Sequence, residues 1–123
     1  MIVIESLNHI SITVSDLDKS VKFYKELFDF DVVEQISGAG QAFLKMGDIL
    51  IALNEVDGYK NQQNNKNCVS FYIDEEDFED AVDELKENEI KIIYGPENLR
   101  NGQSVIFLDP DSNHIELSYP KII

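Results

Sequence analysis

Two residues with metal-binding side chains lie near opposite ends of the chain: His9 in the segment LNHISITV and Glu116 in NHIELSY. Imidazole and carboxylate groups are ligands that proteins use for zinc and other divalent cations. Polar and apolar residues alternate in both segments, so each residue is expected on the polar face of a β-strand. The pair predicts a metal site only if the fold brings the first and last strands together.

The first half of the chain predicts a strand, a helix and three further strands. Residues 9–14 alternate as a strand does, and Ser15 or Asp16 can cap a helix whose apolar residues recur at helical spacing. The helix should therefore pack on the sheet with its apolar face. The remaining strands are expected near residues 32–36, 42–46 and 49–54, separated by turn-forming residues at 37–40 and 47–48.

The same order of elements restarts after residues 57–67, a polar segment rich in Asn and Gln that reads as a linker. A helix beginning in the acidic run at 74–77 is expected to end at Asn88. Strands are expected at residues 68–73, 90–94, 103–108 and 114–119, with turns at Gly95-Pro96 and 109–113. The sequence therefore predicts a single α+β domain over 1–123, built from two βαβββ modules at about 5–56 and 68–120.

Two similar modules indicate an internal duplication, and duplicated modules commonly pack around a local twofold axis. In this register His9 corresponds to Cys68 in the first strands, and Ala52 corresponds to Glu116 in the last strands. Equivalent positions should then converge between the modules. Three of the four positions carry possible metal ligands, so function is expected in a cup between the modules.

The polar faces of the strands favour a pocket. They carry small, neutral or apolar residues in place of the Lys and Glu expected on an open surface, and this is the usual composition of a small-molecule site. An interface between two copies of the chain would require the same composition. The residues concerned include Ser11, Thr13, Asn54, Ser70, Tyr72, Ser104, Ile106 and Ser118.

Composition excludes several classes of protein. The chain has 123 residues and a formal net charge of −14, a field that repels nucleic acid and anionic membranes. No apolar run approaches the ~20 residues of a bilayer span, and the N-terminus lacks the features of a signal peptide. We therefore expect a cytoplasmic protein that binds neither nucleic acid nor membrane. The single cysteine agrees with a reducing compartment.

Two segments resemble one family: LNHISITVSDLDKSVKFYKELFDFDVV at 7–33 and SVIFLDPDSNHIEL at 104–117. They are similar to the opening and closing segments of the vicinal oxygen chelate superfamily, which includes glyoxalase I, extradiol dioxygenases, fosfomycin-resistance enzymes and bleomycin-resistance proteins. The resemblance implies that each sheet curls into a cup with a divalent metal at its floor. It also implies that such chains form homodimers, some of which exchange modules.

Carried over by position, His9 and Glu116 match the family's first-strand His and last-strand Glu ligands. Cys68 stands where metal-binding members have a second His, and Ala52 stands where glyoxalase I has a further Glu, a ligand that the fosfomycin-resistance branch also lacks. A His, a thiolate and a carboxylate can hold zinc, whereas Mg²⁺ and Mn²⁺ would be disfavoured by the thiolate. Alternatively, Cys68 only fills space, and no metal is bound.

The resemblance leaves three functional hypotheses. The first is a divalent-metal-dependent enzyme of lyase, isomerase or thiol transferase type, in which Glu116 is ligand and base while Ser11, Asn54, Ser70 and Ser104 contact the substrate. The second is a metal-free protein that sequesters a cationic small molecule, as bleomycin-resistance proteins do. The third is an interaction module without catalysis. Asp109 and Asp111 are expected to shape a turn, and His114 is expected to be structural or to lie at the pocket rim.

Overall fold

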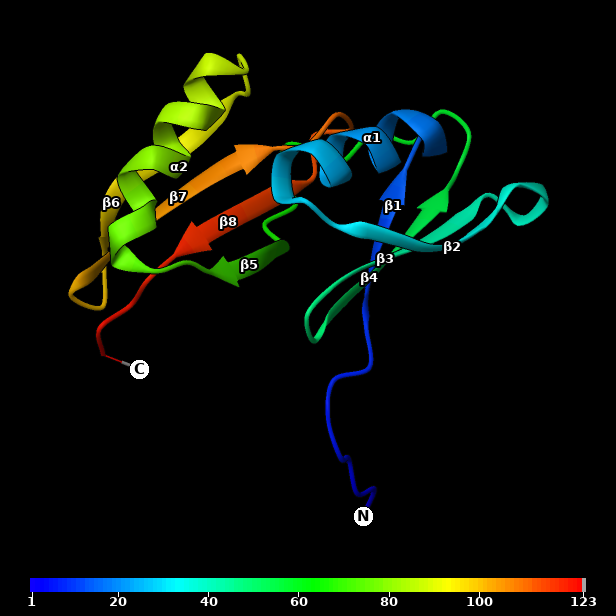
Figure 1. The fold of residues 1–123 in the computed structure, drawn as a ribbon, viewed down its shortest axis with the longest axis horizontal. Helices are drawn as coiled ribbons and strands as arrows, with labels where there is room; N and C mark the ends of the chain where they lie inside the picture. The colour runs from blue at the N-terminus through cyan, green and yellow to red at the C-terminus, as the bar shows by residue number, and fades with distance from the viewer. Residues whose placement is uncertain (123) are drawn as a thin grey trace. The chain divides into compact units, whose positions relative to one another are not determined.

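The computed structural model describes residues 1–122, with Ser37 described by its backbone alone, and the chain divides into two compact units. Unit 1 spans Met1–Lys60 and unit 2 spans Asn61–Ile123. Each unit contains one four-stranded sheet and one α-helix (Figure 1). The α+β class and the two βαβββ modules predicted from the sequence are both confirmed.

Unit 1 is a mixed sheet with one long helix. Its strand order is β1-β4-β3-β2, in which β1 runs parallel to β4 and the other neighbours are antiparallel. The helix connects the edge strand β1 to the opposite edge strand β2. The elements are β1 at Ile10–Val14, α1 at Leu17–Phe28, β2 at Asp31–Ile36, the short 3₁₀ turn η1 at Ser37–Ala39, β3 at Gln41–Met46 and β4 at Ile49–Glu55.

Unit 2 repeats this topology. Its strand order is β5-β8-β7-β6, again with the first strand parallel to the last strand and the remaining neighbours antiparallel. The duplication inferred from the sequence is therefore present at the level of strand order. The elements are β5 at Cys68–Tyr72, α2 at Glu75–Glu87, β6 at Ile92–Leu99, β7 at Gly102–Leu108 and β8 at His114–Ser118.

Each helix lies over one face of its own sheet (Figure 1). The residues that the helices bury are mostly apolar. Because strand residues alternate between faces, every second residue of the central strands points toward the helix and is withdrawn from water. The opposite face of each sheet carries the polar residues together with apolar residues such as Ala52 and Ile106. The buried apolar residues on the helix side include Val14, Tyr24, Leu44, Ile51 and Leu53 in unit 1, and Phe78, Val82, Leu85, Val105, Phe107 and Ile115 in unit 2.

The two helices begin in different ways. Asp16 is the N-cap of α1, and its side chain accepts a hydrogen bond of 3.1 Å from the backbone N–H of Lys19. Glu55 at the end of β4 accepts a second one, of 2.7 Å, from the N–H of Leu17. Asp74 occupies the same position before α2 but makes no side-chain capping bond. Of the two caps proposed for the first helix, the structure selects Asp16.

The turn expected at Gly95-Pro96 lies inside a strand. β6 continues through both residues to Leu99, and its pairing with β7 is interrupted between Tyr94 and Glu97. Gly95 has a φ of +81°, and a Cβ at this position would lie 2.3 Å from the carbonyl oxygen of Ser104. The turn-forming residues therefore mark an irregularity that brings β6 very close to β7, and not a chain reversal.

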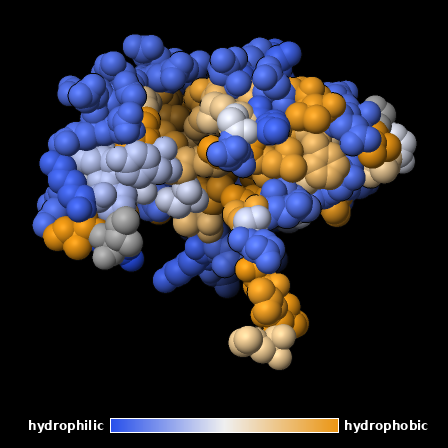
Figure 2. All heavy atoms as spheres, turned by 60° about the horizontal axis from the view of Figure 1, so that its bottom comes forward, coloured by the Kyte–Doolittle hydropathy of each residue, from blue (hydrophilic) through white to orange (hydrophobic). Residues whose placement is uncertain are grey.

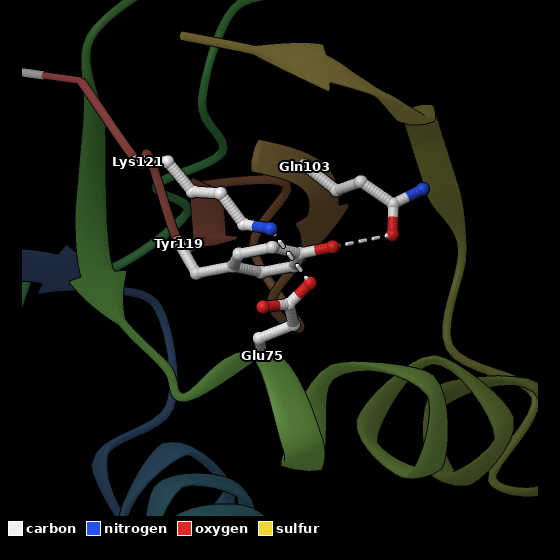
Figure 3. A network of polar contacts seen from close by, with 4 residues as sticks. All are labelled: Glu75, Gln103, Tyr119 and Lys121. Carbon is white, nitrogen blue, oxygen red and sulfur yellow. Dashed lines mark hydrogen bonds and ion pairs between the residues drawn. The ribbon is translucent and has the colours of Figure 1, made fainter. Parts of the chain in front are cut away.

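The C-terminal segment of unit 2 ties the start of α2 to β7 (Figure 3). The hydroxyl of Tyr119 donates to the side-chain oxygen of Gln103 at 2.8 Å, and Lys121 forms an ion pair of 3.0 Å with Glu75. Gly102 is required beside this contact, because a Cβ there would lie 1.7 Å from the carbonyl oxygen of Tyr119. The segment therefore contacts both the first turn of α2 and the beginning of β7.

Ahead of β1, unit 1 begins with an extended segment that is rich in apolar residues (Figures 1 and 2). Met1, Ile2, Val3, Ile4 and Leu7 each expose 74% or more of their surface. This segment leads directly into the residues that carry His9. Separately, none of the helices in residues 1–122 is both long and apolar enough to cross a membrane.

Candidate functional site

The polar face of unit 2 gathers four of the predicted site residues on three adjacent strands. Glu116 lies in β8, between β5 and β7, where its backbone neighbours are Ser70 and Ile106. Cys68 lies two residues before Ser70 on the same face of β5, and Ser104 lies two residues before Ile106 on β7. The strand register therefore places Cys68, Ser70 and Ser104 around the carboxylate.

The Glu116 carboxylate is hydrogen-bonded within this group. The hydroxyl of Ser104 donates to Oε2 of Glu116 at 2.5 Å, and Ser104 is only 1% exposed. A second hydroxyl pair lies beside it, since Ser70 Oγ and Ser118 Oγ are 3.3 Å apart. Ser118 was placed on this face by the sequence but was not predicted as a site residue. Its signal was its position two residues after Glu116.

Cys68 is exposed at the beginning of β5, but its thiol is partly withdrawn from water. Burial raises the pKa of the Cys68 thiol, and the nearby negative charge of Glu116 raises it further. Both causes favour the neutral form. At neutral pH the thiol is therefore protonated, and binding a metal through sulfur requires the release of that proton.

In unit 1, His9 immediately precedes β1 and is exposed. Its Nδ1 lies 2.6 Å from Oδ1 of Asn8, and because a carbonyl oxygen only accepts, Nδ1 carries the proton and donates. The ring also packs edge-on against Phe43, with ring centroids 5.9 Å apart. In the neutral form of a ring with its proton on Nδ1, Nε2 is the nitrogen with a lone pair, which is the form of histidine that binds metals. The role of Asn8 was not predicted.

The remaining predicted residues of unit 1 lie on the same face as His9. Ser11 is exposed and is the register partner of Ala52, which is fully buried. The side-chain oxygen of Asn54 accepts a hydrogen bond of 2.8 Å from the amide of Gln41, its neighbour on β3. Because the oxygen of Asn54 already accepts this hydrogen bond, its amide N–H groups are the ones that can donate to a ligand.

The predicted site residues thus form two groups, one in each unit. His9, Ser11 and Asn54 belong to unit 1, and Cys68, Ser70, Ser104 and Glu116 belong to unit 2. Within each unit, no three His, Cys, Asp or Glu side chains of the described residues lie close enough together to hold a metal ion.

Two aspartates near the last strand have the structural role expected for them. Both oxygens of Asp109 accept hydrogen bonds within the turn, from the backbone N–H groups of Asp111 and Asn113 and from the Asn113 side chain, at 2.8–2.9 Å. Both aspartates are buried. They shape the reversal between β7 and β8, and thereby hold the strand that carries Glu116.

The side chains of His9, Cys68 and Glu116 are of the types that bind divalent metals. The imidazole of His9 is held through Nδ1, so that Nε2 is available, and the carboxylate of Glu116 is held through one of its two oxygens. Supporting hydrogen bonds of this kind orient metal ligands in proteins. With the sulfur of Cys68 the set comprises N, O and S donors, a combination that zinc accepts in tetrahedral geometry.

Comparison with known proteins agrees with this assignment of elements. The model of the family "Glyoxalase/Bleomycin resistance protein/Dioxygenase superfamily" matches residues 6–117. The match therefore spans both βαβββ modules and all seven predicted site residues.

Similar proteins include several with enzyme names. "Metallothiol transferase FosB" of Staphylococcus epidermidis is 38% identical over 93% of this chain and 81% of its own length. "Glutathione transferase FosA" of Serratia marcescens is 32% identical over 93% of this chain and 80% of its own length. Among solved structures, the fosfomycin resistance protein FosX from Mesorhizobium loti is 27% identical, with a TM-score of 0.79 over 97% of this chain and 95% of that one.

Proposed function

Because this chain belongs to the glyoxalase/bleomycin resistance protein/dioxygenase superfamily, we propose that it is a metal-dependent transferase that joins a thiol to a small electrophilic molecule. The observation that carries this proposal is the 38% identity to metallothiol transferase FosB over 93% of the chain. Fosfomycin is the first substrate to test, because the similar FosX protein is named a fosfomycin resistance protein. A cytoplasmic location would supply the reduced thiol.

In this proposal His9, Cys68 and Glu116 hold one divalent cation, with zinc favoured by the sulfur ligand. The bound cation would supply a Lewis acid that stabilises negative charge on an oxygen of the substrate. The His9 ring supplies Nε2 because Asn8 fixes the proton on Nδ1. Cys68 would lose its proton to a base in solution as the metal binds.

The polar side chains around these ligands would bind the substrate. Ser11 is exposed on the face of His9 and offers a hydroxyl. Asn54 offers its amide N–H groups, because Gln41 already donates to its oxygen. Ser70 lies beside Glu116 on the neighbouring strand. Glu116 itself would serve as ligand and as the base that accepts a proton from the attacking thiol. As the sulfur–carbon bond forms, a carbon–oxygen bond of the substrate would break, and the released oxygen would take up a proton.

The proposal requires one metal ion to reach residues of both units. We propose that this occurs in a cup between the modules, either within a single-domain chain or between two chains of a homodimer. Mixing His9→Ala with Glu116→Gln distinguishes the two arrangements. Two chains that share sites would regain one intact metal site in each mixed dimer, whereas sites within a chain would remain defective.

The test of the function begins with protein purified without chelator. Metal content is measured, followed by titration with Zn, Mn, Ni and Fe, and thiol consumption is then followed with fosfomycin and either cysteine or glutathione. We expect one metal ion per site and metal-dependent loss of thiol, both abolished in His9→Ala. A wild-type protein that holds no metal, and gains none on titration, would contradict the proposal.

A second function is favoured by one observation, the net charge of −14, which attracts cations. If Cys68 only fills space, the acidic protein would act by sequestering a cationic small molecule without metal. In that case binding of a bleomycin-like cation would be tight at low salt and weakened by added salt. Salt-independent binding would argue against this alternative.

A further inference from the structure

We propose that Ser104 is a positioning residue for the Glu116 carboxylate, and not a substrate contact as its place on the polar face suggests. The inference rests on the proposed function, because it concerns how Glu116 is prepared to bind a metal ion. Its starting point is the hydrogen bond of 2.5 Å from the Ser104 hydroxyl to Oε2 of Glu116.

The hydrogen bond has the form of a strong one. An O–H group that donates to a charged carboxylate makes a shorter bond, about 2.5–2.7 Å, than one between neutral groups. Ser104 is 1% exposed, so water does not compete for its hydroxyl. The Ser104 hydroxyl donates its single proton in the hydrogen bond to Glu116. It therefore has no proton left to donate to a substrate that enters from solvent.

The strand register keeps the two side chains together. On the antiparallel pair β7 and β8, Ile106 lies opposite Glu116 and Ser104 lies opposite Ser118, so Ser104 is a diagonal neighbour of Glu116 on the same face. On its other side, β6 approaches so closely at Gly95 that a Cβ there would lie 2.3 Å from the carbonyl oxygen of Ser104. The backbone that carries the hydroxyl is therefore confined from both sides.

The two oxygens of the Glu116 carboxylate would therefore have different roles. Oε2 is held by Ser104, so Oε1 is the oxygen that would bind the cation. The hydrogen bond also fixes the plane of the carboxylate before the metal arrives. Loss of a supporting hydrogen bond of this kind typically lowers metal affinity by about 10- to 100-fold.

The test compares Ser104→Ala with Ser118→Ala, which removes the same atom from a buried serine on the same face whose hydroxyl pairs with Ser70. Zinc affinity is measured by competition with a chromophoric chelator, independently of any activity. We expect Ser104→Ala to bind zinc at least ~10-fold more weakly than wild type, and Ser118→Ala to bind it as wild type does. The same comparison in a Glu116→Gln background should show no effect of Ser104→Ala.

Equal zinc affinities for wild type and Ser104→Ala would overturn this inference alone, whereas a wild type that binds no metal would overturn the proposed function as well. If Ser104→Ala does not fold, NMR of the metal-free wild type decides. The Ser104 hydroxyl proton should be protected from exchange and visible downfield, and this signal should be lost in Glu116→Gln. A wild-type protein without the signal would contradict the inference.

Discussion

In the proposed function, the chemistry depends most on Cys68. It stands in the first strand of unit 2, on the face of Glu116, and it is exposed at the strand's beginning. Its raised pKa places it among the less reactive cysteines, because the thiolate is the nucleophile and the metal ligand. A metal ion would reverse this preference by replacing the proton.

Alkylation by iodoacetamide measures the thiolate directly. In metal-free protein we expect the rate to rise with pH around a midpoint above ~8.5, the value of an unperturbed cysteine. Glu116→Gln should lower the midpoint only in part, because burial is the larger cause of the shift. A midpoint at or below that of free cysteine would contradict the account of Cys68.

Replacing Cys68 with His tests the residue as a ligand. The change offers imidazole in place of sulfur at an exposed position. Because Mn²⁺ and Ni²⁺ prefer nitrogen and oxygen donors to thiolate, we expect their affinities to rise relative to that of zinc. Metal titrations of the wild type and Cys68→His give the ratios, and unchanged ratios would show that residue 68 does not bind the metal.

At the scale of elements, the two modules reach the same topology through different local contacts. The start of α1 is fixed by side chains of Asp16 and Glu55, whereas α2 starts at Asp74 without a side-chain cap. Near that start, Glu75 forms an ion pair with Lys121 at the end of unit 2 (Figure 3). Since that pair is exposed, it contributes little to stability.

This difference predicts unequal effects of matched substitutions. Asp16→Ala should lower the free energy of unfolding by about 1 kcal/mol, because it removes the hydrogen bond to Lys19. Asp74→Ala should cost less, since it removes only the favourable charge near the helix N-terminus. Urea unfolding followed by circular dichroism measures both values. Equal losses would show that the capping bond of Asp16 does not contribute.

At the scale of the whole molecule, charge opposes assembly. Each chain carries a net charge of −14, so two copies repel each other at low ionic strength. The screening length falls from about 30 Å at 0.01 M salt to about 8 Å at 0.15 M. We therefore expect the proposed homodimer to strengthen as salt is added across this range.

Sedimentation equilibrium at several salt concentrations measures this dependence. The chain has a mass of 14.0 kDa, and we expect it to shift from monomer toward dimer as salt rises. A dimer that weakens with salt would indicate an interface held by opposite charges. A monomer at all salt concentrations would contradict the proposed homodimer.

Local patterns in the amino-acid sequence are enough to predict the elements and their order. Alternation and helical spacing are local properties, so they identified both βαβββ modules, the cap at Asp16 or its neighbour, and the structural role of Asp109. Gly95-Pro96 was misinterpreted because the same residues serve a turn and a strand irregularity. The choice depends on how closely the neighbouring strand approaches.

Which polar groups already form hydrogen bonds depends on the three-dimensional packing of the chain. The sequence placed Ser104 and Glu116 on one face of the sheet. The hydrogen bond from the Ser104 hydroxyl to the Glu116 carboxylate depends in addition on the register of β7 against β8 and on the orientation of both side chains. Likewise, Asn8 fixes the proton of His9 through a contact between adjacent residues, which strand alternation does not anticipate. Hydrogen bonds depend on fractions of an ångström and on side-chain direction, and residue spacing specifies neither.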